Sequence, residues 1–163
     1  MSEYKTLFEK FSHKTVLIVG DVMVDSYVWG RVDRISPEAP VPVVSVDGKE
    51  HRLGGAANVA LNINSLGATP LLCSIIGNDE TGNIFSGLMS SQGLDTRGLV
   101  VCPGRKTTSK TRVMSGAQHC LRIDDEVTTP IRNEQELLLV EKIVSLITTT
   151  KVDAIIFEDY DKG

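Results

Sequence analysis

The sequence predicts an α/β fold in which a mostly parallel β-sheet carries helices on its faces and a small antiparallel flap is attached to the sheet. Short apolar runs alternate with helical patterns after Leu53, as they do in βαβ units. Two segments that break this alternation carry hairpin patterns, which predicts the flap. The 163 residues, of which 41% are hydrophobic and 23% charged, suffice for one globular domain.

The first predicted strand covers residues 15–20, a short β-branched run that is typical of a buried parallel strand. Asp21 and Asp25 follow its carboxyl end, the side on which open α/β sheets bind their ligands. A carboxylate there can accept hydrogen bonds from two sugar hydroxyls, although a pair of solvated turn acids explains the same pattern. Two carboxylates are too few to indicate a metal site.

A proline-rich stretch follows at residues 34–43, with three prolines at close spacing. Because proline lacks a backbone N–H, the stretch excludes a helix and a central strand, and it predicts an extended connection or an edge strand. Residues 43–46 and 51–53 then flank Asp47-Gly48, a pair that favours a tight hairpin turn.

Gly54-Gly55 opens the first predicted helix, whose apolar residues recur near a period of 3.6, and Gly67 is a natural helix end. Paired glycines let a ligand approach the backbone, and the free amides of the first turn favour an anion or a hydroxyl-rich ligand. Asn58 in that turn offers a donor and an acceptor to a sugar hydroxyl. A tight strand-to-helix turn, with Asn58 capping locally, explains these residues equally well. The spacing matches neither a dinucleotide-binding fingerprint nor a P-loop.

The rest of the chain continues with short apolar runs, which predict strands, and with 3.6-residue apolar patterns, which predict helices. We expect strands at 69–77, 96–101 and 153–157, helices at 79–91 and 133–149, and a second hairpin formed by 107–114 and 118–124. Asn133 is the candidate N-cap of the long helix, because asparagine is a favoured residue at that position.

The second hairpin carries three cations. Lys110 and Arg112 have the same strand parity and therefore share one face, and Arg122 lies beside them if the hairpin forms. Three cations on one face suit a phosphate or a sugar phosphate. Protective charges on a solvated edge strand explain them as well.

Further charged residues follow the last two strands. Asp159, Asp161 and Lys162 come after the final strand and so lie on the ligand side of the sheet. We interpret the acidic run at 124–126 as a solvated segment with no functional role.

Composition excludes several classes of protein. The net charge of −4 disfavours nucleic acid as a main partner, because phosphate backbones require a basic surface. No apolar run approaches the roughly 20 residues that span a membrane, and the polar N-terminus does not resemble a secretory signal. We therefore expect a cytoplasmic protein. The three cysteines and three histidines are scattered, which indicates neither a disulfide framework nor a metal site.

Three motifs together resemble the ribokinase-like (PfkB) carbohydrate kinases. They are Gly20 to Asp25, the glycine turn at 54–60, and Leu66-Gly67-Ala68 followed by Ile76-Gly77-Asn78-Asp79. The resemblance covers residues 15–163 and implies a three-layer ribokinase-like sandwich with a β-lid. It places the lid segments at about 27–53 and 107–124, after an N-terminal extension at 1–14.

Within this family, three segments are similar to the heptose 7-phosphate kinases: Gly20 to Asp25, the proline-rich stretch at 34–43 and the segment at 159–163. That similarity implies transfer of a phosphoryl group from Mg-ATP to the anomeric hydroxyl of D-glycero-β-D-manno-heptose 7-phosphate. The product serves lipopolysaccharide core synthesis through ADP-heptose, and such kinases are often fused to an adenylyltransferase domain.

The resemblance also implies roles for individual residues. Asp25, Gly54, Gly55 and Asn58 match positions that hold the sugar, and Asp21 stands in the same motif as Asp25. Lys110 and Arg112, with Arg122 beside them, become candidate ligands of the substrate's phosphate. Asp159 and Lys162 belong to a motif near the substrate, and the lid that closes over the sugar often makes a homodimer contact.

One departure from the family pattern is the absence of a Gly-Ala-Gly-Asp turn. In the family this turn supplies the catalytic base and the anion hole for the transferred phosphoryl group, on which the reaction depends. The resemblance therefore implies the N-terminal half of a kinase, with the base, the adenine site and the metal-organising acids beyond Gly163. We expect such a chain to be inactive alone, and a non-catalytic sugar-phosphate-binding or dimerisation module is the alternative. We also expect exposed apolar surface around the strand that ends at Phe157, and hence self-association.

Overall fold

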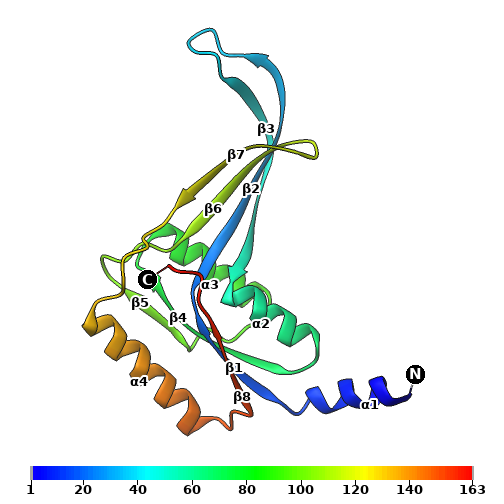
Figure 1. Ribbon diagram of the computed structural model, residues 1–163, viewed down its shortest axis with the longest axis vertical. Helices are drawn as coiled ribbons and strands as arrows, with labels where there is room; N and C mark the ends of the chain where they lie inside the picture. The colour runs from blue at the N-terminus through cyan, green and yellow to red at the C-terminus, as the bar shows by residue number, and fades with distance from the viewer. Residues whose placement is uncertain (1, 163) are drawn as a thin grey trace.

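Two β-sheets form the framework of the protein in a computed structural model, which describes residues 2–162. The parallel sheet has the strand order β5-β4-β1-β8, and all its neighbouring strands are parallel. Its strands are β1 (Thr15–Gly20), β4 (Thr69–Gly77), β5 (Leu99–Cys102) and β8 (Ala154–Glu158). The second sheet, called the lid here, has the order β3-β2-β6-β7 and projects away from the first (Figure 1). Its strands are β2 (Val22–Ile35), β3 (Pro42–Gly55), β6 (Ser109–Ser115) and β7 (Gln118–Asp125).

Helices cover both faces of the parallel sheet (Figure 1). They are α2 (Ala56–Ser65) and α3 (Glu80–Ser91) on one face and α4 (Asn133–Thr149) on the other, and α1 (Ser2–Phe11) precedes the sheet. Ile18 of β1 packs in the core under α2 and α3, where Phe85 is fully buried. Leu17, its neighbour, packs on the opposite side against Leu146 of α4. This alternation confirms the predicted three-layer α/β architecture, because a strand covered on both faces must be apolar on both.

The lid consists of two antiparallel hairpins that are joined by a parallel pair. The β6–β7 hairpin confirms the predicted one. The two hairpins meet where β2 pairs with β6, and this pairing is parallel, so the lid is a mixed sheet and not the purely antiparallel flap that was expected. The parallel pairing follows from the long route between the two strands, which passes through the whole β3-α2-β4-α3-β5 segment.

The predicted turn at Asp47-Gly48 is wrong. β3 runs through these residues as one strand, with Gly48 opposite Trp29 and Val46 opposite Gly30. Asp47 is thus the extra residue of a β-bulge. The pair Asp-Gly is compatible with a bulge as well as with a tight turn, so the sequence pattern did not distinguish the two. The hairpin closes instead through residues 36–41, inside the proline-rich stretch, and β3 is an edge strand of the lid, as that stretch predicts.

Several element ends differ from the expected ones. Gly67 has a positive φ of 90° directly after the C-cap of α2, which confirms its predicted place at the end of that helix. The N-cap of α4 is Arg132 and not Asn133, which is already helical, and the Arg132 backbone N–H donates to Gln135 Oε1 at 3.0 Å. Residues 2–11, expected only as an extension, form a helix.

Apolar side chains are exposed on β8 and α4. Phe157 of β8 is 75% exposed and Leu137 of α4 is 62% exposed. The exposed surface agrees with the sequence-based expectation, whereas self-association stays a prediction. Among the residues that the structure describes, no helix has both the length and the apolar character required to cross a bilayer.

Candidate functional site

The candidate site lies where β1 ends and β2 rises into the lid. In the lid, Asp25 of β2 lies opposite Arg52 on one side and Lys110 on the other. Arg112 lies opposite Arg122 two residues further along the same face. These side chains, together with Tyr27 and Asp124, make up what we call the charged face of the lid.

Asp25 and Arg112 form an ion pair on this face, between Asp25 Oδ1 and Arg112 Nη1. Each side chain is 22% exposed, so the pair is partly shielded from water. The hydrogen bond to Asp25 raises the pKa of Arg112 above its usual value. The Arg112 guanidinium also lies 5.3 Å from the centre of the Tyr27 ring, and that of Arg52 lies 4.7 Å from it, which fixes both cations against an aromatic surface.

Gly54 and Gly55 allow β3 to pass close to β2. A Cβ at Gly54 would overlap Asp25 Oδ2 and approach Met23 Cγ to 2.8 Å. Gly55 has φ of 60°, and the next backbone amide, that of Ala56, donates to the Asp21 carbonyl at 2.8 Å. The tight strand-to-helix turn is therefore present, and Gly54 in addition leaves room for the Asp25 carboxylate.

Asn58 follows one helical turn later. Its side chain is exposed and lines a hollow between β3 and the helices α2 and α3, together with Arg52 and Gln92. The N-cap of α2 is Gly55, and no side chain caps the helix, so the alternative that Asn58 acts as a local cap is wrong.

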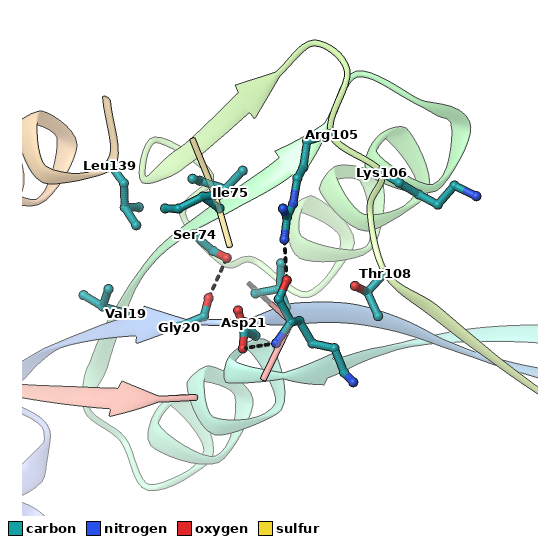
Figure 2. Close-up of a pocket in the computed structure, with 12 residues that line it drawn as sticks. Val19, Gly20, Asp21, Ser74, Ile75, Arg105, Lys106, Thr108 and Leu139 are labelled. Atoms are coloured by element: carbon teal, nitrogen blue, oxygen red, sulfur yellow. Dashed lines mark hydrogen bonds between the residues drawn. The ribbon is translucent and has the colours of Figure 1, made fainter. Parts of the chain in front are cut away.

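Asp21 has a different environment from Asp25, because its carboxylate binds the segment after β8. Asp21 Oδ2 accepts hydrogen bonds from the backbone N–H of Tyr160 at 2.8 Å and of Lys162 at 3.2 Å. Arg105, which Figure 2 shows near Asp21, donates to the Lys162 carbonyl. A small cavity of about 90 Å³ at the end of β1 is lined by Asp21, Arg105, Thr108 and Lys162, among others.

Asp159 lies in a neighbouring hollow, which Gly20, Asp21 and Asp161 also line. Asp159 Oδ1 accepts a hydrogen bond from the Asp161 backbone N–H at 2.8 Å, and Asp161 has a positive φ of 55°. The segment after β8 is therefore a tight turn, which brings its acids and Lys162 to the carboxyl ends of β1 and β8.

The structure brings the three predicted cations together, but each of them is paired with a carboxylate. Lys110 Nζ lies 3.2 Å from Asp124 Oδ2 and 3.5 Å from Glu126 Oε2, and Arg122 Nε lies 2.9 Å from Asp124 Oδ1. Burial raises the pKa of Asp124, but the hydrogen bonds from Lys110 and Arg122 outweigh it, and the pKa falls below its usual value.

Two of the three acids in the run at 124–126 are ion-paired, which the interpretation as a merely solvated run did not include, whereas their lack of a functional role stays a prediction. Asp124 and Glu126 pair with cations of the site, and their side chains are 24% and 20% exposed. Asp125 pairs instead with the exposed Lys106. Asp124 lies directly opposite Lys110 in the pairing of β6 with β7, and Glu126 follows just beyond the end of β7.

The sequence placed Asp79 in a family motif and at the start of a helix, but it did not reveal that Asp79 attaches the lid to the parallel sheet. Asp79 caps α3 by accepting from the Gly82 N–H at 2.7 Å, and it accepts from the Thr107 N–H at 2.8 Å just before β6. Burial raises its pKa, but these backbone hydrogen bonds outweigh it and lower the pKa overall. An Asp directly before a helical pattern can be recognised in the sequence as a helix cap. Its hydrogen bond with Thr107 can be recognised only in the folded structure.

Comparison with known proteins places the chain in a family. The pattern described as pfkB family carbohydrate kinase matches residues 13–161. The chain belongs to this family. Its members are kinases of carbohydrates by name, and the match covers both the parallel sheet and the lid.

Individual relatives agree with this assignment. The bifunctional protein HldE of Trichlorobacter lovleyi is 44% identical over 159 residues, which cover 98% of this chain and 32% of the relative. The bifunctional protein HldE of Helicobacter pylori J99 is 40% identical over 150 residues, or 92% of this chain and 32% of that protein. The chain thus spans about a third of the length of these curated relatives.

Solved structures show the same fold. A putative ribokinase from Agrobacterium tumefaciens superposes with a TM-score of 0.60 at 21% identity, over 88% of this chain and 44% of that one. At this identity the likeness supports the ribokinase-like fold alone, which agrees with the predicted fold class.

Proposed function

We propose that this chain is the sugar-binding part of a kinase that phosphorylates D-glycero-β-D-manno-heptose 7-phosphate at its anomeric hydroxyl, with ATP as the donor. The observation that carries the proposal is the charged face of the lid, where a carboxylate for hydroxyls lies beside cations for a phosphate. Family membership supports the kinase class. The heptose rests on the resemblance at 34–43 and 159–163 and on the similarity to the HldE proteins.

The proposed roles follow from the chemistry of each group. Asp25 accepts hydrogen bonds from sugar hydroxyls above Gly54 and Gly55, and Asn58 adds an amide at the edge of the site. Lys110, Arg112 and Arg122 provide positive charge for the phosphate already on the substrate. Asp21, Asp159 and Lys162 form the opposite wall at the end of β1.

ATP and Mg²⁺ are part of the proposed reaction, but we assign no ligands for them. Residues 2–162 contain no group of three or more His, Cys, Asp or Glu side chains that could hold a metal ion. The sequence also contains no Gly-Ala-Gly-Asp turn to supply a base. We therefore expect this chain to bind the sugar phosphate and to transfer no phosphoryl group by itself.

The second candidate function is a non-catalytic module that binds a sugar phosphate or dimerises. The outer face of the lid favours it, because Leu121 and Ile123 of β7 are 55% and 50% exposed and lie opposite the face of Arg122. Adjacent apolar side chains of this kind favour a contact between two lids, so we propose a homodimer.

Calorimetric titration of the chain with heptose 7-phosphate, fructose 6-phosphate and ribose tests the proposal, with a coupled ATP assay run in parallel. We expect heptose 7-phosphate to bind most tightly and ATP turnover to be absent. Asp25→Asn should weaken that binding, whereas Asp33→Asn on the exposed part of the same strand should leave it unchanged. Equal binding of all three sugars would contradict the heptose assignment, and measurable turnover would contradict the expected inactivity.

A further inference from the structure

Glu126 connects two lysines that come from different parts of the chain. Its Oε2 lies 3.5 Å from Lys110 Nζ in lid strand β6, and its Oε1 lies 3.1 Å from Lys162 Nζ in the segment after β8. The three side chains are only 16–20% exposed, so water screens these contacts less than it screens surface ion pairs. One carboxylate therefore bridges the lid and the end of the parallel sheet.

The position of Lys162 is set by its backbone as well as by Glu126. Asp21 accepts its N–H and Arg105 donates to its carbonyl, so the residue is held on both sides. Lys110 is held differently, in a strand that pairs with β2 on one side and β7 on the other. The backbones of both lysines are thus held by contacts that do not involve Glu126.

The charges around this bridge are almost balanced. The cations are four, Lys110, Arg112, Arg122 and Lys162, and the carboxylates are three, Asp25, Asp124 and Glu126. The difference, 4 − 3, leaves a net charge of +1, and every one of these four cations has a carboxylate partner. An anionic ligand that reaches two of these cations therefore competes with a carboxylate for them.

Glu126 is the carboxylate that is easiest to displace. Its contact with Lys110 is the longest among these pairs, whereas Asp124 is held at 3.2 Å by Lys110 and at 2.9 Å by Arg122. Glu126 also lies just beyond β7, which ends at Asp125, so it can move without breaking the hydrogen bonds of a strand.

We propose that Glu126 occupies the anion position between Lys110 and Lys162, and that the phosphate of a phosphomonoester displaces it on binding. A phosphate presents two oxygens side by side as a carboxylate does, but it carries more negative charge, so it competes well for two ammonium groups. This inference rests on the proposed sugar-phosphate function and adds a residue that sets the specificity of that site. A neutral sugar gains nothing from displacing Glu126, so the bridge selects phosphorylated ligands.

The test compares the wild-type chain with Glu126→Gln in calorimetric titrations with inorganic phosphate. Glutamine keeps the shape but removes the competing charge, so phosphate should bind roughly threefold to tenfold more tightly, the range expected for one partly shielded charge contact. Glu136→Gln, an exposed site in α4 with the same change in type and charge, should leave phosphate binding unchanged. Adding Lys110→Gln to Glu126→Gln should remove the gain.

Equal or weaker phosphate binding by Glu126→Gln overturns the inference, since it would show that Glu126 assists or ignores the anion. A measurement on the wild-type chain covers the case of a variant that does not fold. Saturating phosphate should speed amide exchange at 126–128, because Glu126 loses its lysine partners, and unchanged exchange there contradicts displacement. Because inorganic phosphate carries no sugar, tighter phosphate binding together with no binding of heptose 7-phosphate would sink the proposed function and leave this inference standing.

Discussion

Gly54→Ala is the change that most directly tests the geometry of the site. The added Cβ would overlap Asp25 Oδ2 and lie 2.8 Å from Met23 Cγ, where an ordinary contact is at least 3.4 Å. Met23 Cγ must therefore withdraw by about 0.6 Å, and the Asp25 carboxylate must leave its place. The Asp25–Arg112 ion pair and the proposed acceptor for sugar hydroxyls are disturbed together.

The expected size of the effect follows from these contacts. A hydrogen bond to a charged group contributes about 1.5–3 kcal/mol, and the partial exposure of Asp25 places it near the lower limit, which corresponds to roughly tenfold weaker binding of heptose 7-phosphate. Overpacking costs about 1–3 kcal/mol of stability, or a fall in Tm of roughly 2–10 °C for a chain of this size.

Gly48→Ala is the matched control, because Gly48 lies in the same strand and a Cβ there would meet nothing within 4 Å. Calorimetric titration and thermal melts of both variants decide the outcome. Gly48→Ala should bind and melt like the wild-type chain, whereas Gly54→Ala should lose both affinity and Tm. If Gly54→Ala behaves like Gly48→Ala, the Asp25 carboxylate does not lie over Gly54 and the site is built differently.

Two substitutions and one labelling experiment test other parts of the structure. Asp79→Asn should lower the free energy of unfolding by about 1–3 kcal/mol at pH 7, because one buried N–H loses its acceptor. Since the folded chain lowers the pKa of Asp79, its stabilisation is present above the unfolded pKa of about 3.9 and lost as the pH falls through the folded value. Denaturant melts of wild type and variant should therefore converge in acid, and a constant gap would contradict this. Burial raises the pKa of Cys73 to about 11, so a thiol reagent at pH 8 should modify the half-buried Cys120 first, as mass spectrometry of the labelled chain can show. Asp21→Ala should speed exchange of the Lys162 amide, which loses its acceptor, and unchanged protection would show that another group holds this segment.

Local patterns predicted much of the fold. The boundaries of β1 and β4 and the length of α4 agree with the expected ones, because β-branched runs and a 3.6-residue period reflect burial within one element. The family motifs likewise pointed to Asp25 and Gly54, and the structure places the Asp25 carboxylate where a Cβ on Gly54 would overlap it.

Local patterns failed where one residue type suits two structures. Asp47-Gly48 fits a turn and a bulge alike, and only the pairing of β3 with β2 selects the bulge. In the same way, the acidic run at 124–126 looks like unpaired surface charge until its cationic partners are known.

The sequence by itself determined the α/β class, the family and the positions of most strands and helices, since each depends on residues close together in the chain. Only the tertiary structure decided how the site is assembled. Asp25 pairs with Arg112 across 87 positions, Asp21 binds the Lys162 amide across 141, and Glu126 reaches Lys162 across 36. The physical reason is that charge pairing and hydrogen bonding act over a few ångströms in space, a distance that spacing along the chain does not determine.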